Sequence, residues 1–466
     1  MLETEGSPSR RSSALRRPPC ASLAALALTA AVVAHVFPSS SSSSSSSGVT
    51  PRDSQPRSGA RASKEDASCV DAFARSEVPY LRYPRQYVAY EVRGSPGGSA
   101  DGGFAPPPVV DGKLDDLAWE EVGWSEDFRD ISDLTGRLDP PRFRTRVKMR
   151  WDASWLYVAA EMQEREVWAN QTAKNSVVFR DDDFEIFVDA DGSTHAYKEF
   201  EVNALNTTWD LLLNAPYGRD GGYENSTRTF GAEGFSMTPP LRSSVFVAGG
   251  RVNDPSAGPA SHWTVEVALP VDRLTLNTTA DRPPAPGHFW RINFSRVEWR
   301  VVVSPDGASY WKVPDEPEDN WAWSPQGAVA MHLPERWGML QFASGAVNAT
   351  PVVRNRQWTV RAVAATVYYA QQAWFDGPGK GCYTEDVTQL TRVAPPGVLD
   401  GECVQDVSVT TFSRGGGKGG VDGCGFVAKI TALDGKQAAC VWSDRRIDVV
   451  EGAAAMEACW RPDERR

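Results

Sequence analysis

Between about residues 84 and 345, hydrophobic and polar residues alternate in short runs that Asp, Gly and Pro interrupt. The clearest runs are residues 144–151, 156–162, 184–188, 200–202, 263–269 and 289–294. A period of two is typical of β-strands that bury one face, whereas helical periodicity over three or more turns is absent from this region. We therefore predict a mainly β protein whose main domain, residues 84–345, is an antiparallel β-sandwich.

A helical pattern begins after this region. Hydrophobic residues recur there at intervals of three and four, namely Val360, Val363, Ala364, Val367 and Trp374. This spacing predicts an amphipathic helix over residues 357–375, which Gly377 ends. Strand-like runs follow at residues 407–412, 426–431 and 439–443. We predict a small, cysteine-rich α+β domain over residues 355–460.

The amino terminus has the order of a targeting segment. Four arginines precede an uncharged run that ends at Phe37. Residues 1–37 therefore form either a cleaved signal peptide or a signal anchor with its basic end in the cytoplasm. Residues 38–78, which include an uninterrupted serine tract, are typical of a linker. We expect a secreted protein or a type II single-pass membrane protein that faces the extracellular space or the Golgi lumen.

Glycosylation signals agree with export, because glycans are attached to Asn-x-Ser/Thr sequons only after export. The chain has six such sequons, at Asn170, Asn206, Asn225, Asn277, Asn293 and Asn348.

The cysteines also agree with an oxidising compartment. Cys20 lies in the targeting segment, and the other six are Cys69, Cys382, Cys403, Cys424, Cys440 and Cys459. An even number outside the targeting segment predicts disulfides, whose connectivity the sequence leaves open. Five of the six lie in the tail, so if all are paired, one bridge must tie the tail to Cys69.

Composition narrows the function classes. With Lys+Arg 49 against Asp+Glu 60, the net charge of −11 argues against nucleic acid as a partner. The chain has 17 tryptophans, most of which we expect in the core, while some are suited to stacking on the flat faces of sugars. No zinc-protease, P-loop, dinucleotide-binding or serine-hydrolase motif is present in a suitable context.

Carboxylates gather on one predicted sheet face. A period of two places Asp183, Glu185 and Asp189 on the same side of one strand, and Glu199, Glu201 and Asn203 share a side of the next. Three interpretations stay open: a solvated sheet face, a sugar-binding groove, or a glycosidase carboxylate pair. Asp189 and Asp191 are also suited to a structural calcium ion, although no cofactor is required.

Several motifs occur in a set order. The first is VDGKLDDLAW at residues 110–119, and the others are residues 147–151 followed by 156–158, 182–189, 263–270, 291–296, and 323–325 followed by 337–338. Together they resemble family 9 carbohydrate-binding modules. The resemblance implies a sugar-binding β-sandwich, often supported by calcium and usually carried by extracellular enzymes that degrade plant-type polysaccharides.

The resemblance also implies site residues. Members of the family hold a terminal sugar between two aromatic rings; Phe179 matches the first ring, and Glu185 matches a carboxylate that binds hydroxyls. Met331-His332 stands where the second ring is expected, with Trp321 and Trp323 as nearby alternatives. Glu201 stands where an arginine serves the groove. We predict polar contacts from Glu185, Asn203 and Arg296, with stacking by Phe179 and Trp323.

The function expected is recognition of a polysaccharide or oligosaccharide in extracellular or lumenal carbohydrate catabolism. The alternative is a glycoside hydrolase that uses the acidic groove around Glu185. A haem-carrying electron-transfer sandwich is a third class, which requires a Met or His axial pair.

Overall fold

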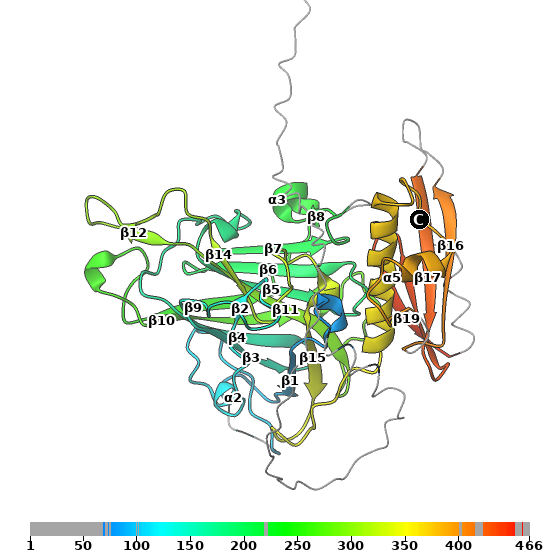
Figure 1. The fold of residues 1–466 in the computed structure, drawn as a ribbon. Coiled ribbons are helices and arrows are strands. Elements are labelled where there is room, and N and C mark those ends of the chain that lie inside the picture. Colours follow the sequence, from blue (N-terminus) through cyan, green and yellow to red (C-terminus); the bar gives the residue numbers. More distant parts are fainter. Residues whose placement is uncertain are drawn as a thin grey trace, which may run out of the picture. The chain divides into compact units, whose positions relative to one another are not determined.

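The computed structural model describes residues 69, 73, 76–98, 100, 102–218, 222–399, 403–414, 423–452 and 459 (Figure 1). All the described residues belong to one compact unit. The predicted targeting segment, Cys20 and the serine tract lie outside the described residues. None of the helices in the described part of the chain has the length and hydropathy of a membrane span.

The larger sheet has 13 strands. In spatial order its main path is β8 (Glu224–Asn225), β7 (Thr208–Leu213), β6 (Tyr197–Asn203), β5 (Asp183–Asp189), β11 (Phe289–Glu298), β15 (Gly338–Ala343), β1 (Gln86–Glu91), β3 (Thr145–Trp151), β4 (Trp155–Gln163), β10 (His262–Pro270) and β9 (Arg242–Ala248). β14 (Asp319–Ala322) pairs with β11 and with β2 (Arg129–Asp130). β1 runs parallel to both β15 and β3, so the sheet is mixed.

The two halves of this sheet share one hydrophobic core. Phe184, Phe200 and Phe294 come from β5, β6 and β11, and they belong to the same buried cluster as Val147 and Val265 of β3 and β10. Alternation along each strand explains the packing, because every second side chain points into the space between the halves. The mainly β fold is confirmed, and the two layers are halves of one curled sheet that meet at β1.

Short elements connect the strands. They are η1 (Pro79–Leu81), α2 (Leu117–Glu120), η2 (Val178–Arg180), α3 (Thr227–Phe230), η3 (Gly231–Glu233), η4 (Pro255–Ala257), α4 (Val271–Leu274), η5 (Pro334–Arg336) and the hairpin β12 (Val301–Val303) with β13 (Tyr310–Lys312).

The carboxy-terminal domain has the predicted α+β composition. It consists of α5 (Trp358–Asp376), α6 (Val387–Thr391) and an antiparallel sheet in the order β16 (Asp406–Arg414), β17 (Gly423–Thr431), β18 (Gln437–Trp442) and β19 (Ile447–Glu451) (Figure 1). The hydrophobic side of α5, with Val363 and Val367, packs in one cluster with Phe426 and Val441 of the sheet.

Residues from outside this domain complete its core. Cys69 and Phe73 lie within the predicted linker, yet both are buried in the same cluster as α5, together with Leu81 and with Met339 of β15. A disulfide joins Cys69 to Cys403, so the predicted bridge between Cys69 and the tail is confirmed.

The remaining described cysteines differ in state. A second disulfide joins Cys440 to Cys459, whereas Cys382 and Cys424 are free thiols in this structure. Two of the three expected bridges are therefore present.

Candidate functional site

The carboxylates predicted to share a sheet face do so. Glu185 of β5 lies directly opposite Glu201 of β6, and Asp183 lies opposite Asn203. Phe184, Ile186 and Val188 point the other way, into the core. We call Asp183, Glu185, Glu199, Glu201 and Asn203 the acid-bearing face.

Burial sets the protonation of these acids. The Glu185 side chain is only 5% exposed. Asp183, Glu185 and Glu201 each place one carboxylate oxygen within 4.8 Å of the oxygens of the other two. Burial raises the pKa of Glu185 to about 7. Burial first, and then the charge of Glu185, raises the pKa of Glu199 and of Glu201 well above the ordinary value. At neutral pH the face therefore presents protonated and ionised carboxyl groups together, that is, hydrogen-bond donors as well as acceptors.

Two half-exposed aromatic rings flank the acids. Phe179 in η2 is 42% exposed, and its backbone N–H donates to Glu201 Oε2 at 3.2 Å. Tyr217 is 45% exposed. Burial and then the charge of Glu199 raise the pKa of Tyr217, as expected for a hydroxyl beside that acid. A polar surface between two rings suits a flat ligand that carries hydroxyl groups.

Sequence reasoning missed Tyr217. The Tyr217 ring packs edge-on against His332, with ring centroids 4.5 Å apart, and the His332 Nδ1 and Tyr197 hydroxyl lie 2.8 Å apart. Burial lowers the pKa of His332 to about 4, so this histidine is neutral. The sequence held a signal for Tyr217, since an aromatic residue between Pro216 and Gly218, in a turn, is suited to exposure.

Asn203 has no hydrogen-bonding capacity left for a ligand. It is fully buried, and its Nδ2 donates to the Gln171 carbonyl at 2.8 Å and to Asp181 Oδ2 at 2.9 Å. Its Oδ1 accepts from the backbone N–H groups of Leu205 and Thr207, both at 3.0 Å. Asn203 therefore holds the turn that follows β6, and the predicted contact with sugar is corrected to a positioning role.

Arg296 and Trp323 lie on the core side. Arg296 is opposite Phe184 in the register of β11 with β5, so it points away from the acid-bearing face. Trp323 is fully buried, and its ring lies 5.8 Å from that of Phe294. The predictions of Arg296 as a sugar contact and of Trp323 as a stacking face are corrected, because neither side chain is open to a ligand.

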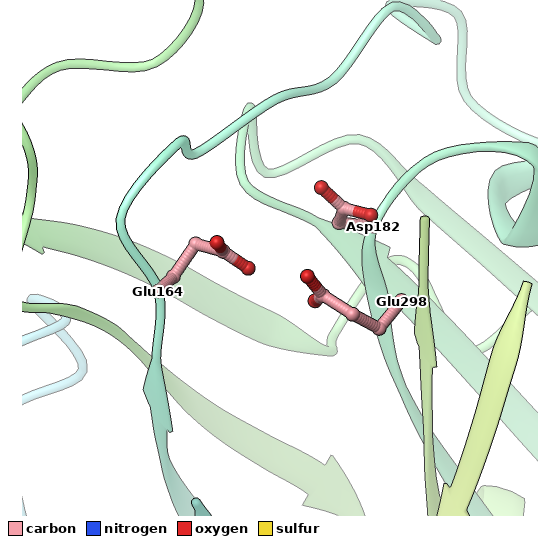
Figure 2. A group of neighbouring side chains, drawn as sticks. All are labelled: Glu164, Asp182 and Glu298. Atoms are coloured by element: carbon pink, nitrogen blue, oxygen red, sulfur yellow. The ribbon is translucent and has the colours of Figure 1, made fainter. Parts of the chain in front are cut away.

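Arg296 instead belongs to a buried ionic group. Its Nη2 donates to Glu164 Oε2 and to Glu298 Oε2, both at 2.6 Å. Glu164, Asp182 and Glu298 point toward one another (Figure 2), with an oxygen of each within 4.8 Å of the others. Arg142 also donates to Glu298 at 3.0 Å. Two guanidinium groups already pair with Glu164 and Glu298, so a calcium ion here would have to displace or compete with both cations.

The predicted calcium ligands are partly engaged by protein groups: each has at least one protein partner, while Asp189 Oδ1 has none among the described residues. Asp189 Oδ2 accepts from the Thr194 N–H at 2.8 Å. Asp191 accepts from the Ser193 N–H at 3.0 Å, and from the Thr279 N–H and hydroxyl at 2.7 and 3.0 Å. Neither residue belongs to the acidic groups, among the described residues, whose oxygens gather closely enough for a metal. Nothing in the described residues therefore supports a calcium site at Asp189 and Asp191.

The sequons differ in accessibility. Asn170, Asn206, Asn277 and Asn348 are exposed, and Asn225 is half-buried. Asn293 is fully buried, its Nδ2 donates to the Ser324 carbonyl at 2.9 Å, and its Oδ1 accepts from the Ser324 N–H at 2.9 Å. A glycan on Asn293 is incompatible with this fold, and that prediction is corrected; glycosylation at the other five stays a prediction.

Comparisons with known proteins point to one family. Residues 110–226 match the family model described as "Carbohydrate family 9 binding domain-like". This segment contains Phe179, Tyr217 and the whole acid-bearing face. No curated protein matches the chain.

Solved structures show a weaker likeness. A protein from Bacteroides uniformis is 16% identical, with 56% of this chain and 99% of that chain covered and a TM-score of 0.35. A family 9 carbohydrate-binding module from Caldicellulosiruptor kristjanssonii was solved with cellotriose (16% identity, 58% and 100% covered, TM-score 0.30) and with glucose (16%, 57% and 100%, TM-score 0.29). The match of the family model shows that residues 110–226 of this chain are similar to the carbohydrate family 9 binding domain-like family.

Proposed function

We propose that the protein binds a polysaccharide or oligosaccharide on the acid-bearing face, between Phe179 and Tyr217. One observation carries the proposal: a cluster of buried carboxyl groups lies beside two half-exposed rings, Phe179 and Tyr217, within the segment that matches the family model. Sugar hydroxyls both donate and accept, and the CH faces of a pyranose stack on aromatic rings.

Export is part of the same proposal. Residues 1–37 would direct the protein to the extracellular space or the Golgi lumen, as a secreted or anchored glycoprotein with a role in carbohydrate catabolism. The disulfide between Cys69 and Cys403 supports an oxidising compartment.

Titration calorimetry with soluble glucans, xylans and mannans tests binding. We expect wild-type protein to bind at least one of them, and Phe179→Ala and Glu185→Gln to weaken that binding about tenfold each, the loss expected for one stacking or charge-assisted contact. Phe246→Ala is the matched control, because Phe246 has a similarly exposed ring (39%) on β9, in the other half of the sheet. Absence of heat with every polysaccharide would contradict the proposal.

Hydrolysis is a second candidate, favoured by one observation. A glutamic acid with a pKa of about 7 is suited to act as a general acid in a glycosidase. Release of reducing sugar by the wild-type protein, lost in Glu185→Gln, would establish catalysis; binding without release would leave recognition as the function.

A further inference from the structure

A cavity separate from the acid-bearing face lies beside the hairpin β12–β13. Its volume is about 350 Å³, and Trp168, Asn170, Asp181 and Trp311 are among the residues that line it. The volume lies at the lower end of the range of small-molecule sites and suits one or two sugar rings.

Two of the residues that line this cavity each carry a buried polar atom with no hydrogen-bond partner among the described residues. These atoms are Trp168 Nε1 and Asp181 Oδ1, on side chains that are 3% and 0% exposed. The second oxygen of Asp181 is fully used, since it accepts from the Asn170 and Gln171 N–H groups at 2.8 and 2.6 Å. One hydrogen-bond donor, Trp168 Nε1, and one acceptor, Asp181 Oδ1, therefore remain for a ligand. A buried polar atom without a partner is energetically unfavourable, and a ligand would supply the missing hydrogen bonds.

An exposed ring completes the cavity. Trp311 is 57% exposed on β13, and Tyr310 beside it is buried. Lys312 Nζ lies 3.2 Å from the ring centroid of Trp299 and 5.3 Å from that of Trp168, so the lysine is held among the indoles. An indole face with one free donor and one free acceptor is the chemistry that recognises a sugar ring.

We propose that this cavity is a second saccharide-binding subsite, in which one ring stacks on Trp311 while its hydroxyls accept from Trp168 Nε1 and donate to Asp181 Oδ1. The inference rests on the proposed function for its ligand class but uses different residues. The cavity also borders the first site, because Arg180 lines it and directly follows Phe179, whose carbonyl accepts from Trp299 Nε1 at 3.1 Å. One oligosaccharide can thus extend from the acid-bearing face into the cavity.

The sugar ring has two available sources. Asn170 lines the cavity and starts the sequon Asn170-Gln171-Thr172, so the glycan of this chain is one source and a separate oligosaccharide is the other. The chemistry of recognition is shared, and the experiment separates the sources.

The test compares oligosaccharides of one to six rings, cut from a polysaccharide that the wild-type protein binds, by calorimetry with the full exported chain. We expect affinity to rise with length in the wild type. Trp311→Ala, and Trp168→Phe, which keeps an aromatic ring but removes the N–H, should lower affinity for the longest ligand about fivefold to tenfold and leave the monosaccharide unchanged. Phe246→Ala again serves as the control.

The outcomes separate the two proposals. If no saccharide binds the wild type, the proposed function fails. If Phe179→Ala weakens binding while Trp311→Ala and Trp168→Phe bind every length as the wild type does, only the subsite is overturned. If Asn170→Gln, made in the same glycosylating host, gains affinity for the longest ligand and Trp311→Ala removes that gain, the subsite is supported with the chain's own glycan as its occupant.

Discussion

At the scale of single residues, Glu185 links stability to pH. Its pKa rises from an ordinary 4.5 to about 7 on folding, because burial disfavours the charged form. The folded state therefore binds more protons than the unfolded state between pH 4.5 and 7, and stability falls as pH rises through this window. We expect Glu185→Gln to remove part of this loss and to be more stable than wild type at pH 8, by about 1–3 kcal/mol.

Urea unfolding at pH 5 and pH 8 measures this difference. The matched control is Glu316→Gln, since Glu316 lies on the surface and pairs with Arg300, whose side chain is 52% exposed. Equal pH dependence in wild type and Glu185→Gln would show that Glu185 is not the group that titrates.

Alternation explains which site residues could be predicted from the sequence. It placed Asp183, Glu185, Glu199 and Glu201 on one face, as observed. The same rule, applied to β11, puts Ser295 rather than Arg296 opposite Glu185. The prediction of Arg296 as a sugar contact came from the motif resemblance and was wrong, whereas alternation along the strand gives the correct face. The burial of Trp323 and the position of the Tyr217 ring beside the acid-bearing face depend on loops that are distant in sequence. No local sequence pattern specifies how such loops pack.

At the scale of elements, Arg296 joins the two halves of the curled sheet. It projects from β11 in one half, and its Nη1 donates to Thr145 Oγ1 of β3 and to the Gln163 carbonyl of β4 in the other half, at 3.1 and 2.9 Å. We expect Arg296→Met to destabilise the protein by about 3–5 kcal/mol, because removal of the cation leaves Glu164 and Glu298 buried without it.

Urea unfolding with two companion variants isolates this effect. Arg296→Lys keeps the positive charge but not the planar guanidinium group. Its loss of stability should therefore lie between zero and that of Arg296→Met. Arg300→Ala breaks only a surface pair with Glu316 and should cost about 0.5 kcal/mol or less. A loss for Arg296→Met no larger than that for Arg300→Ala would contradict the joining role.

The elements themselves were largely predictable, and their connections were not. Residues 357–375 were predicted helical and α5 spans Trp358–Asp376, because a long apolar stripe at intervals of three and four is unambiguous. The parallel pairing of β1 with both β15 and β3 joins segments far apart in sequence, and no local signal specifies it. Disulfide connectivity is likewise a property of the fold rather than of cysteine spacing.

At the scale of the whole molecule, the two free cysteines are positioned for a third disulfide. Cys424 Sγ lies 3.2 Å from the carbonyl oxygen of Gly381, the residue before Cys382. In an oxidising compartment we expect the two thiols to pair, and alkylation followed by mass spectrometry of the exported protein should find neither modified. Alkylation of both under denaturing conditions, without prior reduction, would contradict this pairing.

The carboxy-terminal domain depends on the rest of the chain. Phe73, Leu81 and Met339 fill its core from outside, and Arg361 of α5 donates to the backbone carbonyls of Asp191 and Gly192 at 2.9 and 2.5 Å. A fragment of residues 355–466 lacks all these partners and the bridge from Cys403 to Cys69. Loss of such a bridge alone costs about 2–5 kcal/mol, comparable to the whole stability of a small domain.

We therefore expect residues 355–466 alone to be unfolded or rapidly digested, whereas residues 61–466 should resist limited proteolysis. Cys403→Ser within residues 61–466 is the matched variant, because it removes the bridge and leaves Phe73, Leu81 and Met339 in place; its melting temperature should lie below that of the parent. A cooperative melt and a protected core in the isolated fragment would show instead that the domain is autonomous. The buried contacts with Phe73 and Met339 would then follow the folding of the domain rather than cause it.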